Sequence, residues 1–109
     1  MPDISSDLRR SVALQVNFRD IVETAIGLHQ YREFRSRQPL VEAAFEVIES
    51  GIRCKFQLER NEVSVRVAKE ELKTCRSSLT NLMSQLSVFL DGRDKEEVLE
   101  KRRKIWIRI

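Results

Sequence analysis

Hydrophobic and polar residues alternate along three short segments of the chain. The alternation runs through residues 12–18, 52–58 and 63–67, where every second side chain is a large apolar one. A period of two is typical of a β-strand with one buried face and one exposed face. Arg60 and Asn61 separate the last two segments, at the spacing of a tight hairpin turn. The pattern therefore predicts a three-stranded antiparallel sheet that is covered on one face only.

Elsewhere the apolar residues recur at intervals of three and four, which is the period of a helix. This spacing predicts helices over about 19–34 and about 69–90. Asp20 and Glu23 fit a capping box at the start of the first helix. A shorter helix is expected over 39–50, from Pro39 to Gly51, with a strand as the alternative for that segment. Residues 94–104 could form a further charged helix.

Together these elements predict an α+β domain over residues 11–91. Two main helices would pack on one face of the sheet, and residues 38–50 would contain a short inserted helix. Residues 1–10 are polar and are expected to be loose. Residues 92–109 are a charged, basic extension, in which the last ten residues hold five basic side chains and one acidic one. A chain of 109 residues has room for a single domain with one core.

Composition and charge narrow the class of protein without identifying it. The formal net charge is +3 and the isoelectric point is near 9.1, which permits a nucleic-acid or anionic partner without requiring one. Cys54 and Cys75 are too few for a disulfide scaffold and are interpreted as buried thiols in a reducing compartment. The sequence has no N-terminal signal pattern and no apolar run of membrane-spanning length, so a soluble intracellular protein is expected.

The segment TCRSSLTNLMSQLSVFL, residues 74–90, carries one charged side chain, Arg76, in a chain that is 34% charged. Small or uncharged polar residues occupy both sides of its apolar stripe: Thr74, Ser78, Asn81 and Gln85 on one flank, and Ser77, Thr80, Ser84 and Ser87 behind. A solvated helix face normally carries Lys and Glu, which are better helix formers than Ser, Thr or Asn. Charged residues are depleted in interface cores because their desolvation is costly. The segment is therefore interpreted as a docking face, with an exposed Ser-rich surface as the alternative.

No arrangement of residues in the sequence indicates catalysis. His29, the single histidine, is in line with the apolar stripe of the first predicted helix. We interpret it as a partly buried packing residue, with a catalytic base as the alternative. The sequence contains no Gly-rich phosphate loop, no metal-ligand spacing and no Ser/His/Asp set. A non-enzymatic protein without a cofactor is therefore expected.

The stretch VSVRVAKEELKTCRSSLTNLMSQLSVF, residues 63–89, resembles the small Pcc/LAGE (CTAG/Pcc) family subunit of the KEOPS (EKC) complex. The resemblance covers residues 11–91. It departs from the family at Arg19, where Pro is usual, at Arg60, where Gly is usual, and around 38–50, which looks like an insertion. The matching positions are Val65, Arg66, Glu70, Glu71, Arg76, Ser78, Asn81, Gln85, Leu86 and Ser87.

The resemblance implies a non-catalytic scaffold and dimerisation subunit in the cytoplasm and nucleus. In such a complex, which makes threonylcarbamoyladenosine at position 37 of tRNA, the family's sheets dimerise and its helices dock on the catalytic ATPase-like subunit. The second subunit of the dimer would be another copy of the chain or another small subunit, and contact with tRNA would be indirect. The docking residues implied here are Thr74, Ser78, Asn81 and Gln85, together with Ile21 and Ala25 from the first helix.

The alternative function is a stand-alone basic domain that binds RNA or another nucleic acid, or a protein. Arg53, Lys55 and Arg66 would lie on the exposed face of the sheet. Lys101, Arg102, Arg103 and Lys104 precede Trp106, and cations beside an aromatic ring can bind phosphate and stack a base. These residues could instead be solubilising charges, since Glu59 and Glu62 lie in the same region. An enzyme that depends on an unseen cofactor is the third reading.

Overall fold

The computed structural model describes residues 4–107, and every regular element in that range is helical. The predicted α+β fold is therefore wrong, because the described residues form no strand and no sheet. The helices are α1 (Ile4–Gly27), a 3-10 turn η1 (Leu28–Gln30), α2 (Arg32–Arg35), α3 (Gln38–Glu59), α4 (Val65–Ser87) and α5 (Gly92–Ile107).

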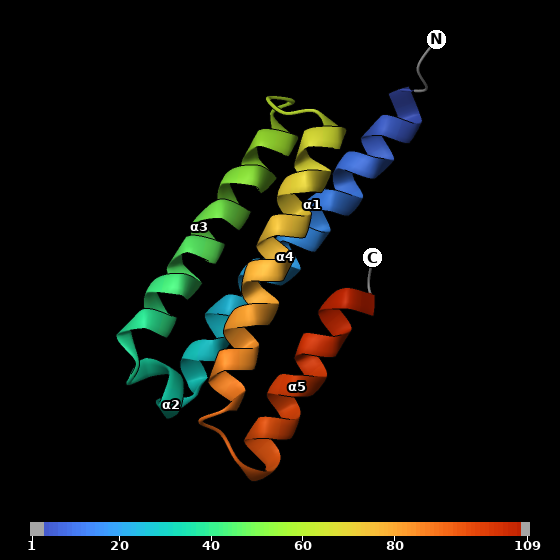
Figure 1. Cartoon of the computed structure of the whole chain (residues 1–109). Coiled ribbons are helices and arrows are strands. Elements are labelled where there is room, and N and C mark those ends of the chain that lie inside the picture. The colour runs from blue at the N-terminus through green and yellow to red at the C-terminus, as the bar shows by residue number, and fades with distance from the viewer. Residues whose placement is uncertain (1–3, 108–109) are drawn as a thin grey trace.

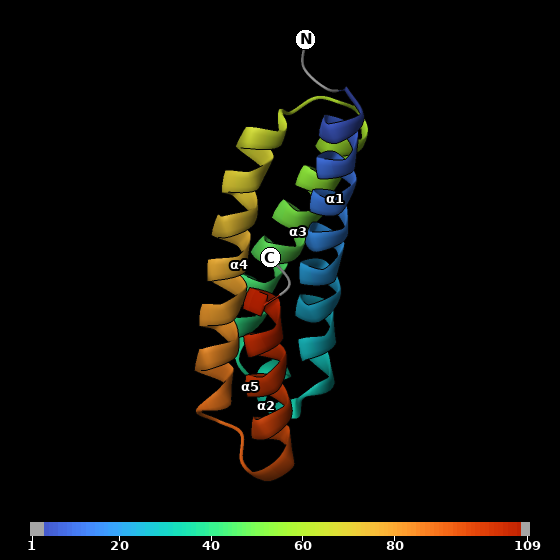
Figure 2. The same cartoon turned by 90° about the vertical axis from the view of Figure 1, so that its right-hand side faces the viewer.

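Three long helices form an up-and-down bundle, and a shorter helix leans on its side. α1, α3 and α4 run alternately in opposite directions, while α2 makes the turn between α1 and α3 (Figure 1). α5 turns back along α4 and covers one end of the seam between α4 and α1 (Figure 2). The molecule is elongated, with extents of 54 × 24 × 17 Å. Helices of 22 to 24 residues, each about 33–36 Å long at a rise of about 1.5 Å per residue, account for most of this length.

The first predicted strand lies in the middle of α1, and burial explains why its alternation was misleading. Leu14 and Phe18 are buried, whereas Val12 and Val16 are exposed. Residues four apart share one face of a helix, and residues two apart lie on nearly opposite faces. Four apolar residues in strict alternation therefore also describe a helix with one buried stripe and one exposed apolar stripe.

The second predicted strand, residues 52–58, repeats this arrangement in the second half of α3. Cys54 and Leu58 are buried, and Ile52 and Phe56 are exposed. α3 begins with Pro39 in its first turn, as predicted, but it continues through Gly51 to Glu59. The predicted insertion at 38–50 is thus the first half of a long core helix.

The predicted β-hairpin is wrong: the turn at Arg60 and Asn61 joins two helices, not two strands. Asn61 adopts a left-handed conformation, with φ of 56°, between α3 and α4. Residues 63–67 do not form a strand: they lead into α4, whose first turn is capped by Ser64. The Ser64 hydroxyl accepts a hydrogen bond from the backbone N–H of Val67 at 3.2 Å.

The predicted helices agree better with the structure than the predicted strands do. The helix expected over about 69–90 is α4, which begins a few residues earlier. The helix expected over about 19–34 is the end of α1 together with η1 and α2, so Asp20 and Glu23 lie in mid-helix and form no capping box. The charged helix expected at 94–104 is α5. Of residues 1–10, which were expected to be loose, residues 4–10 are the first turns of α1, and residues 1–3 lie outside the described range.

Gly51 sets the distance between α1 and α3. A Cβ atom built on Gly51 would lie 2.5 Å from Cγ2 of Val22 and 3.6 Å from the carbonyl oxygen of Phe18. Only a residue without a side chain allows the two helices to approach this closely. Gly51 therefore serves as a contact point within a continuous helix and not as its end.

The core is a single cluster that receives side chains from every long helix, α5 included. Val98 of α5 is fully buried, and Ile105 packs against the cluster. The largest fully buried side chains are Phe18, Phe34, Leu28, Leu72, Leu79, Leu82, Met83, Leu86 and Val98. α5 therefore packs as part of the bundle, although its sequence was interpreted as a basic extension beyond the domain.

We expect Gly51→Ala to destabilise the protein and Gly27→Ala to stabilise it. Alanine gains up to about 1 kcal/mol of helix propensity over glycine at either position. A Cβ at Gly27 meets nothing within 4 Å, whereas a Cβ at Gly51 collides with the stiff side chain of Val22. Overpacking of this kind costs about 1–3 kcal/mol. Urea melts of the two variants should differ by at least about 1 kcal/mol, and equal melts would disprove the close contact.

Removal of residues 92–109 should lower stability, although the sequence was interpreted as placing them in an extension beyond the domain. Burial of Val98 alone is worth about 1.5–3 kcal/mol, and the deletion also uncovers its neighbours on α4. Far-ultraviolet circular dichroism in urea, applied to residues 1–91 and to the full chain, measures the loss. Coincident transitions would show that α5 contributes nothing to the fold.

Candidate docking groove

The charge-poor surface of α4 has two flanks, and α5 covers one of them. Thr80 and Ser87 are buried on the flank that faces α5. Their hydroxyls bond within α4: Thr80 donates to the carbonyl oxygen of Ser77 at 3.1 Å, and Ser87 donates to that of Ser84 at 2.7 Å. Arg102 of α5 donates through Nε to the carbonyl oxygen of Thr80 at 3.3 Å. Small residues on this flank are therefore explained by close packing inside the chain.

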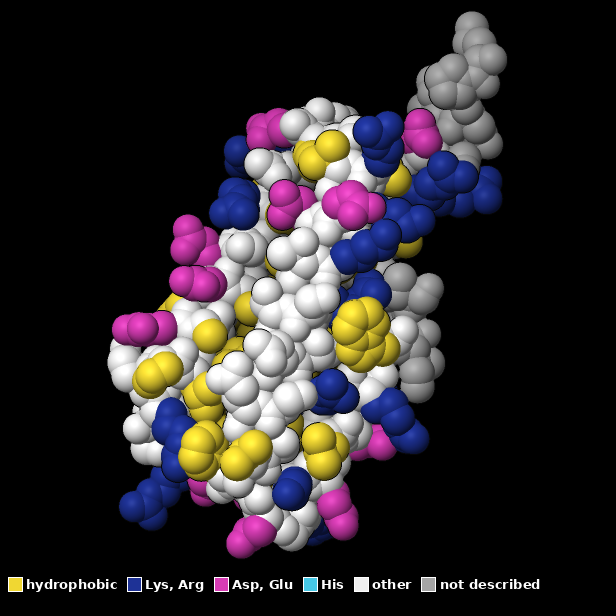
Figure 3. Space-filling model, in the orientation of Figure 1, with side chains coloured by type: hydrophobic (Ala, Val, Ile, Leu, Met, Phe, Trp, Pro, Cys, Tyr) yellow, Lys and Arg dark blue, Asp and Glu magenta, His cyan; other side chains and the backbone are white. Residues whose placement is uncertain are grey.

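The other flank of α4 remains open. Thr74, Ser78, Asn81 and Gln85 are all exposed, and all four line one groove between α3 and α4. α3 contributes the opposite wall, through Ala43, Glu46, Val47 and Ser50. The groove encloses about 290 Å³. Figure 3 shows the uncharged polar band along α4, with acidic side chains beside it over α3.

The groove combines an acidic rim with an apolar floor. Glu46 of α3 and Glu71 of α4 stand on its two walls, and its described lining residues include no Lys or Arg. Val47, Cys75 and Leu82 are buried beneath the polar side chains. Such a surface offers hydrogen bonds, negative charge and a small apolar contact to a bound segment.

The groove carries no reactive nucleophile. Burial, together with the smaller effects of the neighbouring Cys54 and Glu71, raises the pKa of the Cys75 thiol to about 11. Burial also raises the pKa of the Cys54 thiol. A thiol with such a pKa is protonated near neutral pH, whereas the thiolate is the nucleophile. Both cysteines are unpaired and buried, in agreement with the interpretation of the sequence.

Two of the predicted docking residues do not reach the surface. Ile21 and Ala25 are buried in the core side of α1, where Ala25 has no exposed area. Their spacing of four places them with Phe18 on the stripe that packs against the bundle. The signal that separates them from the groove residues was present in the sequence, because both are apolar members of a core stripe.

The predicted nucleic-acid-binding residues are not gathered on one face. Arg53 and Lys55 lie on α3, where Lys55 pairs with Glu59 at 2.6 Å, and Arg66 lies at the start of α4. The four basic residues of α5 also separate. Arg103 pairs with Glu100 at 2.7 Å, Arg102 bonds to α4, and Lys101 and Lys104 line a cavity beside α1. The structure therefore shows no continuous basic surface formed by these residues.

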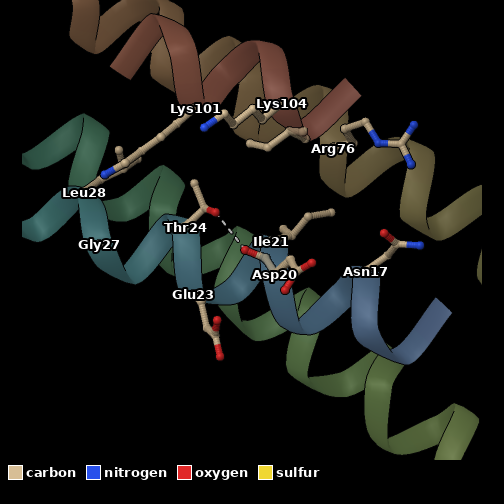
Figure 4. A pocket seen from close by; sticks show the side chains of 11 residues that line it. Asn17, Asp20, Ile21, Glu23, Thr24, Gly27, Leu28, Arg76, Lys101 and Lys104 are labelled. Carbon is tan, nitrogen blue, oxygen red and sulfur yellow. Dashed lines mark hydrogen bonds between the residues drawn. The ribbon is translucent and has the colours of Figure 1, made fainter. Parts of the chain in front are cut away.

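The cavity beside α1 is open to solvent, has α5 as one wall and has a volume of about 320 Å³ (Figure 4). Lys101 and Lys104 enter it from α5, and Asp20 and Thr24 lie opposite on α1. The hydroxyl of Thr24 donates to the backbone carbonyl of Asp20 at 2.8 Å. With both signs of charge and the apolar side chains of Ile21 and Ile105, the lining favours no single class of ligand.

Arg76 lines the same cavity and is the least expected side chain in the bundle. It is 5% exposed, and its Nε and Nη2 atoms find no hydrogen-bond partner among the described residues. Its guanidinium lies 5.2 Å from the ring centre of Trp106. Burial lowers its pKa, because the charged form is poorly solvated there. The site therefore carries a desolvation cost that the cation–π contact only partly offsets.

No metal-binding arrangement appears within the described part of the chain. Its histidine, cysteine and carboxylate side chains form no cluster that could hold a metal ion. His29 is partly buried, as predicted: its Nδ1 lies 3.0 Å from the carbonyl oxygen of Ile26, and its ring packs edge-on against Phe34. Between residues 4 and 107, no helix has the length and apolar character needed to cross a membrane.

Comparison of the chain with protein-family models, with curated proteins and with solved structures finds no match. The resemblance to the Pcc/LAGE family therefore has no support from these comparisons.

We expect Arg76→Met to raise stability. Methionine fills a similar volume without buried donors, and relief of an unsatisfied buried group is worth about 1–3 kcal/mol. Loss of the cation–π contact with Trp106 reduces this gain in stability by about 0.5–1 kcal/mol. Denaturant melts check the sign, with the exposed Arg66→Met as the control that should stay within about 0.5 kcal/mol of the parent. A destabilised Arg76→Met would show that the buried donors are satisfied in solution.

Proposed function

We propose that the protein is a non-catalytic docking module that binds a helical segment of a partner protein in the groove between α3 and α4. One observation carries this proposal: four small or amide side chains, Thr74, Ser78, Asn81 and Gln85, are exposed in one groove. Packing against α5 cannot explain them, because α5 covers the other flank of α4. These residues are uncharged and are weaker helix formers than Lys or Glu, and their presence at an exposed surface favours an interface there.

The lining of the groove indicates the chemistry of the bound segment. Glu46 and Glu71 have no ion pair within the described chain and stand on opposite walls. Each carboxylate would accept a Lys or Arg of the partner. Beside it, a small apolar side chain would contact Val47 and Leu82, and polar side chains would bond to Asn81 and Gln85. A basic amphipathic helix meets these requirements.

Membership of the KEOPS complex stays an untested prediction. The sheet that the resemblance implied, and the dimerisation through that sheet, are absent from the described residues. The docking proposal therefore rests on the groove and not on the resemblance. The catalytic ATPase-like subunit remains one candidate for the partner. The crosslinking experiment described below identifies the partner and so tests this candidate.

Ser78→Arg should block docking and leave the fold intact. Ser78 is exposed, so the change should alter the free energy of unfolding by no more than about 0.5 kcal/mol. At a packed interface the longer side chain fills the groove, and association should weaken by several kcal/mol because a buried charge is mismatched against the cationic partner. Ser77→Arg is the matched control, since Ser77 is also exposed but does not line the groove.

A photo-crosslinking residue at position 78, with the same residue at position 77 as control, identifies the partner in cells. We expect one protein to be captured from position 78 and not from position 77, through a helical peptide that contains Lys or Arg. Binding to that protein should survive Ser77→Arg and fail with Ser78→Arg. Equal binding by both variants would refute the groove as the docking site.

A further inference from the structure

α3 carries a second apolar stripe on the side opposite the groove. Phe45, Ile52 and Phe56 are 59%, 42% and 49% exposed, and Ile48 between them is half-buried. Three of the four groove residues of α3, Ala43, Glu46 and Ser50, lie two positions before a stripe residue. Two positions correspond to about 200° around the helix axis. The stripe is therefore a separate surface that the docking groove leaves unused and on which only Ile48 packs against the core.

α1 packs beside α3 and also carries exposed apolar residues. α1 packs against α3 in the antiparallel direction, and the ring of His29, just after α1, lies 6.0 Å from the ring of Phe45. Leu8, Val12 and Ile26 are exposed apolar residues of α1. Along the stripe runs a shallow hollow of about 540 Å³ lined by Phe45, Ile48, Ile52, Glu49 and Arg53. Contiguous exposed apolar surface of this kind marks an interaction site.

The charges beside the stripe that make no ion pair within the described residues are segregated by sign. Glu42, Glu46 and Glu49 follow its first half, and Arg53 and Arg60 follow its second half. Lys55 and Glu59, also in the second half, pair with each other at 2.6 Å and leave its net charge unchanged. Glu46, Glu49 and Arg53 make no ion pair within the described residues. The guanidinium of Arg60 lies 5.7 Å from the ring centre of Phe56, at the end of the stripe. The helix thus presents an apolar surface with one acidic end and one basic end.

We propose that this face binds a second copy of the chain, with the two α3 helices packed antiparallel about a two-fold axis. In that arrangement each flank of the stripe faces the same flank of the second copy, running in the opposite direction. A register centred near Gly51 places Glu49 opposite Arg53 of the partner subunit and Glu42 opposite Arg60 of the partner subunit. Phe45 then lies near Phe56 of the partner subunit.

Charge complementarity selects this occupant and this direction. A parallel pair would bring the acidic halves together and the basic halves together, which is unfavourable. The antiparallel pair matches every acidic half with a basic half, and it does so twice because of the symmetry. Since the docking groove lies on the other side of α3, the dimer would leave both grooves open.

Sedimentation equilibrium of the full chain tests the dimer. The parent should associate, and Ile52→Glu should weaken association by at least about tenfold, because the symmetry buries two unpaired charges. Val88→Glu is the matched control: Val88 is 75% exposed at the end of α4, away from the stripe, and its substitution should leave association unchanged. A monomeric parent at tens of micromolar, or a parent-like Ile52→Glu, would overturn the proposal.

A charge-reversal pair tests the direction and register without altering an apolar residue. Glu49→Arg alone should impair dimerisation, because two arginines then face each other, and Arg53→Glu alone should impair it through two glutamates. A mixture of the two variants restores both opposite-charge contacts and should form a heterodimer. The double variant Glu49→Arg/Arg53→Glu should regain self-association. Failure of the mixture to associate while each single variant stays folded would refute the antiparallel register.

Discussion

The contact of α1 with α3 at Gly51 is the constraint on which the rest of the bundle depends. With no Cβ in the way, Val22 lies against the backbone of α3, and the two helices run side by side for most of their length. The residue at this point must continue the helix of α3 and must also lack a side chain. α4 then fills the groove that the pair leaves on one side, with Leu72, Leu79 and Leu86 fully or almost fully buried. α5 lies against α4 on the outside of this three-helix frame.

The failure of the strand prediction has a definite physical origin. Period-two alternation over seven residues does not distinguish a half-buried strand from a helix with apolar stripes on two sides. Leu14 and Phe18 belong to one stripe of α1, and Val12 and Val16 belong to the other. A soluble monomer would normally carry polar residues on the second side. The misleading residues are thus informative, because those of α3 form the face that we assign to a second copy of the chain.

The sequence was a better guide to α4. Its helical period, its buried leucines and the exposed flank formed by Thr74, Ser78, Asn81 and Gln85 all follow from spacing alone. What spacing could not supply was the position of α5. The sequence of α5 is highly charged, so the burial of Val98 was not predicted from it. Thr80 and Ser87 are buried by α5, which follows them in the chain. A charge-poor helix face can therefore be assigned to an interface only when the elements that pack on both of its flanks are known.

The positions of Tyr31 and Trp106 have a spectroscopic consequence. The chain contains one tyrosine and one tryptophan, and both lie on the seam of α5. The hydroxyl of Tyr31 donates to Glu97 at 3.4 Å, and the ring of Trp106 covers Arg76 of α4. Intrinsic fluorescence and near-ultraviolet dichroism therefore report on the attachment of α5, whereas far-ultraviolet dichroism reports on all the helices. If α5 detaches before the bundle unfolds, the two signals separate along a denaturation curve, and the chain itself provides the probes that distinguish the two events.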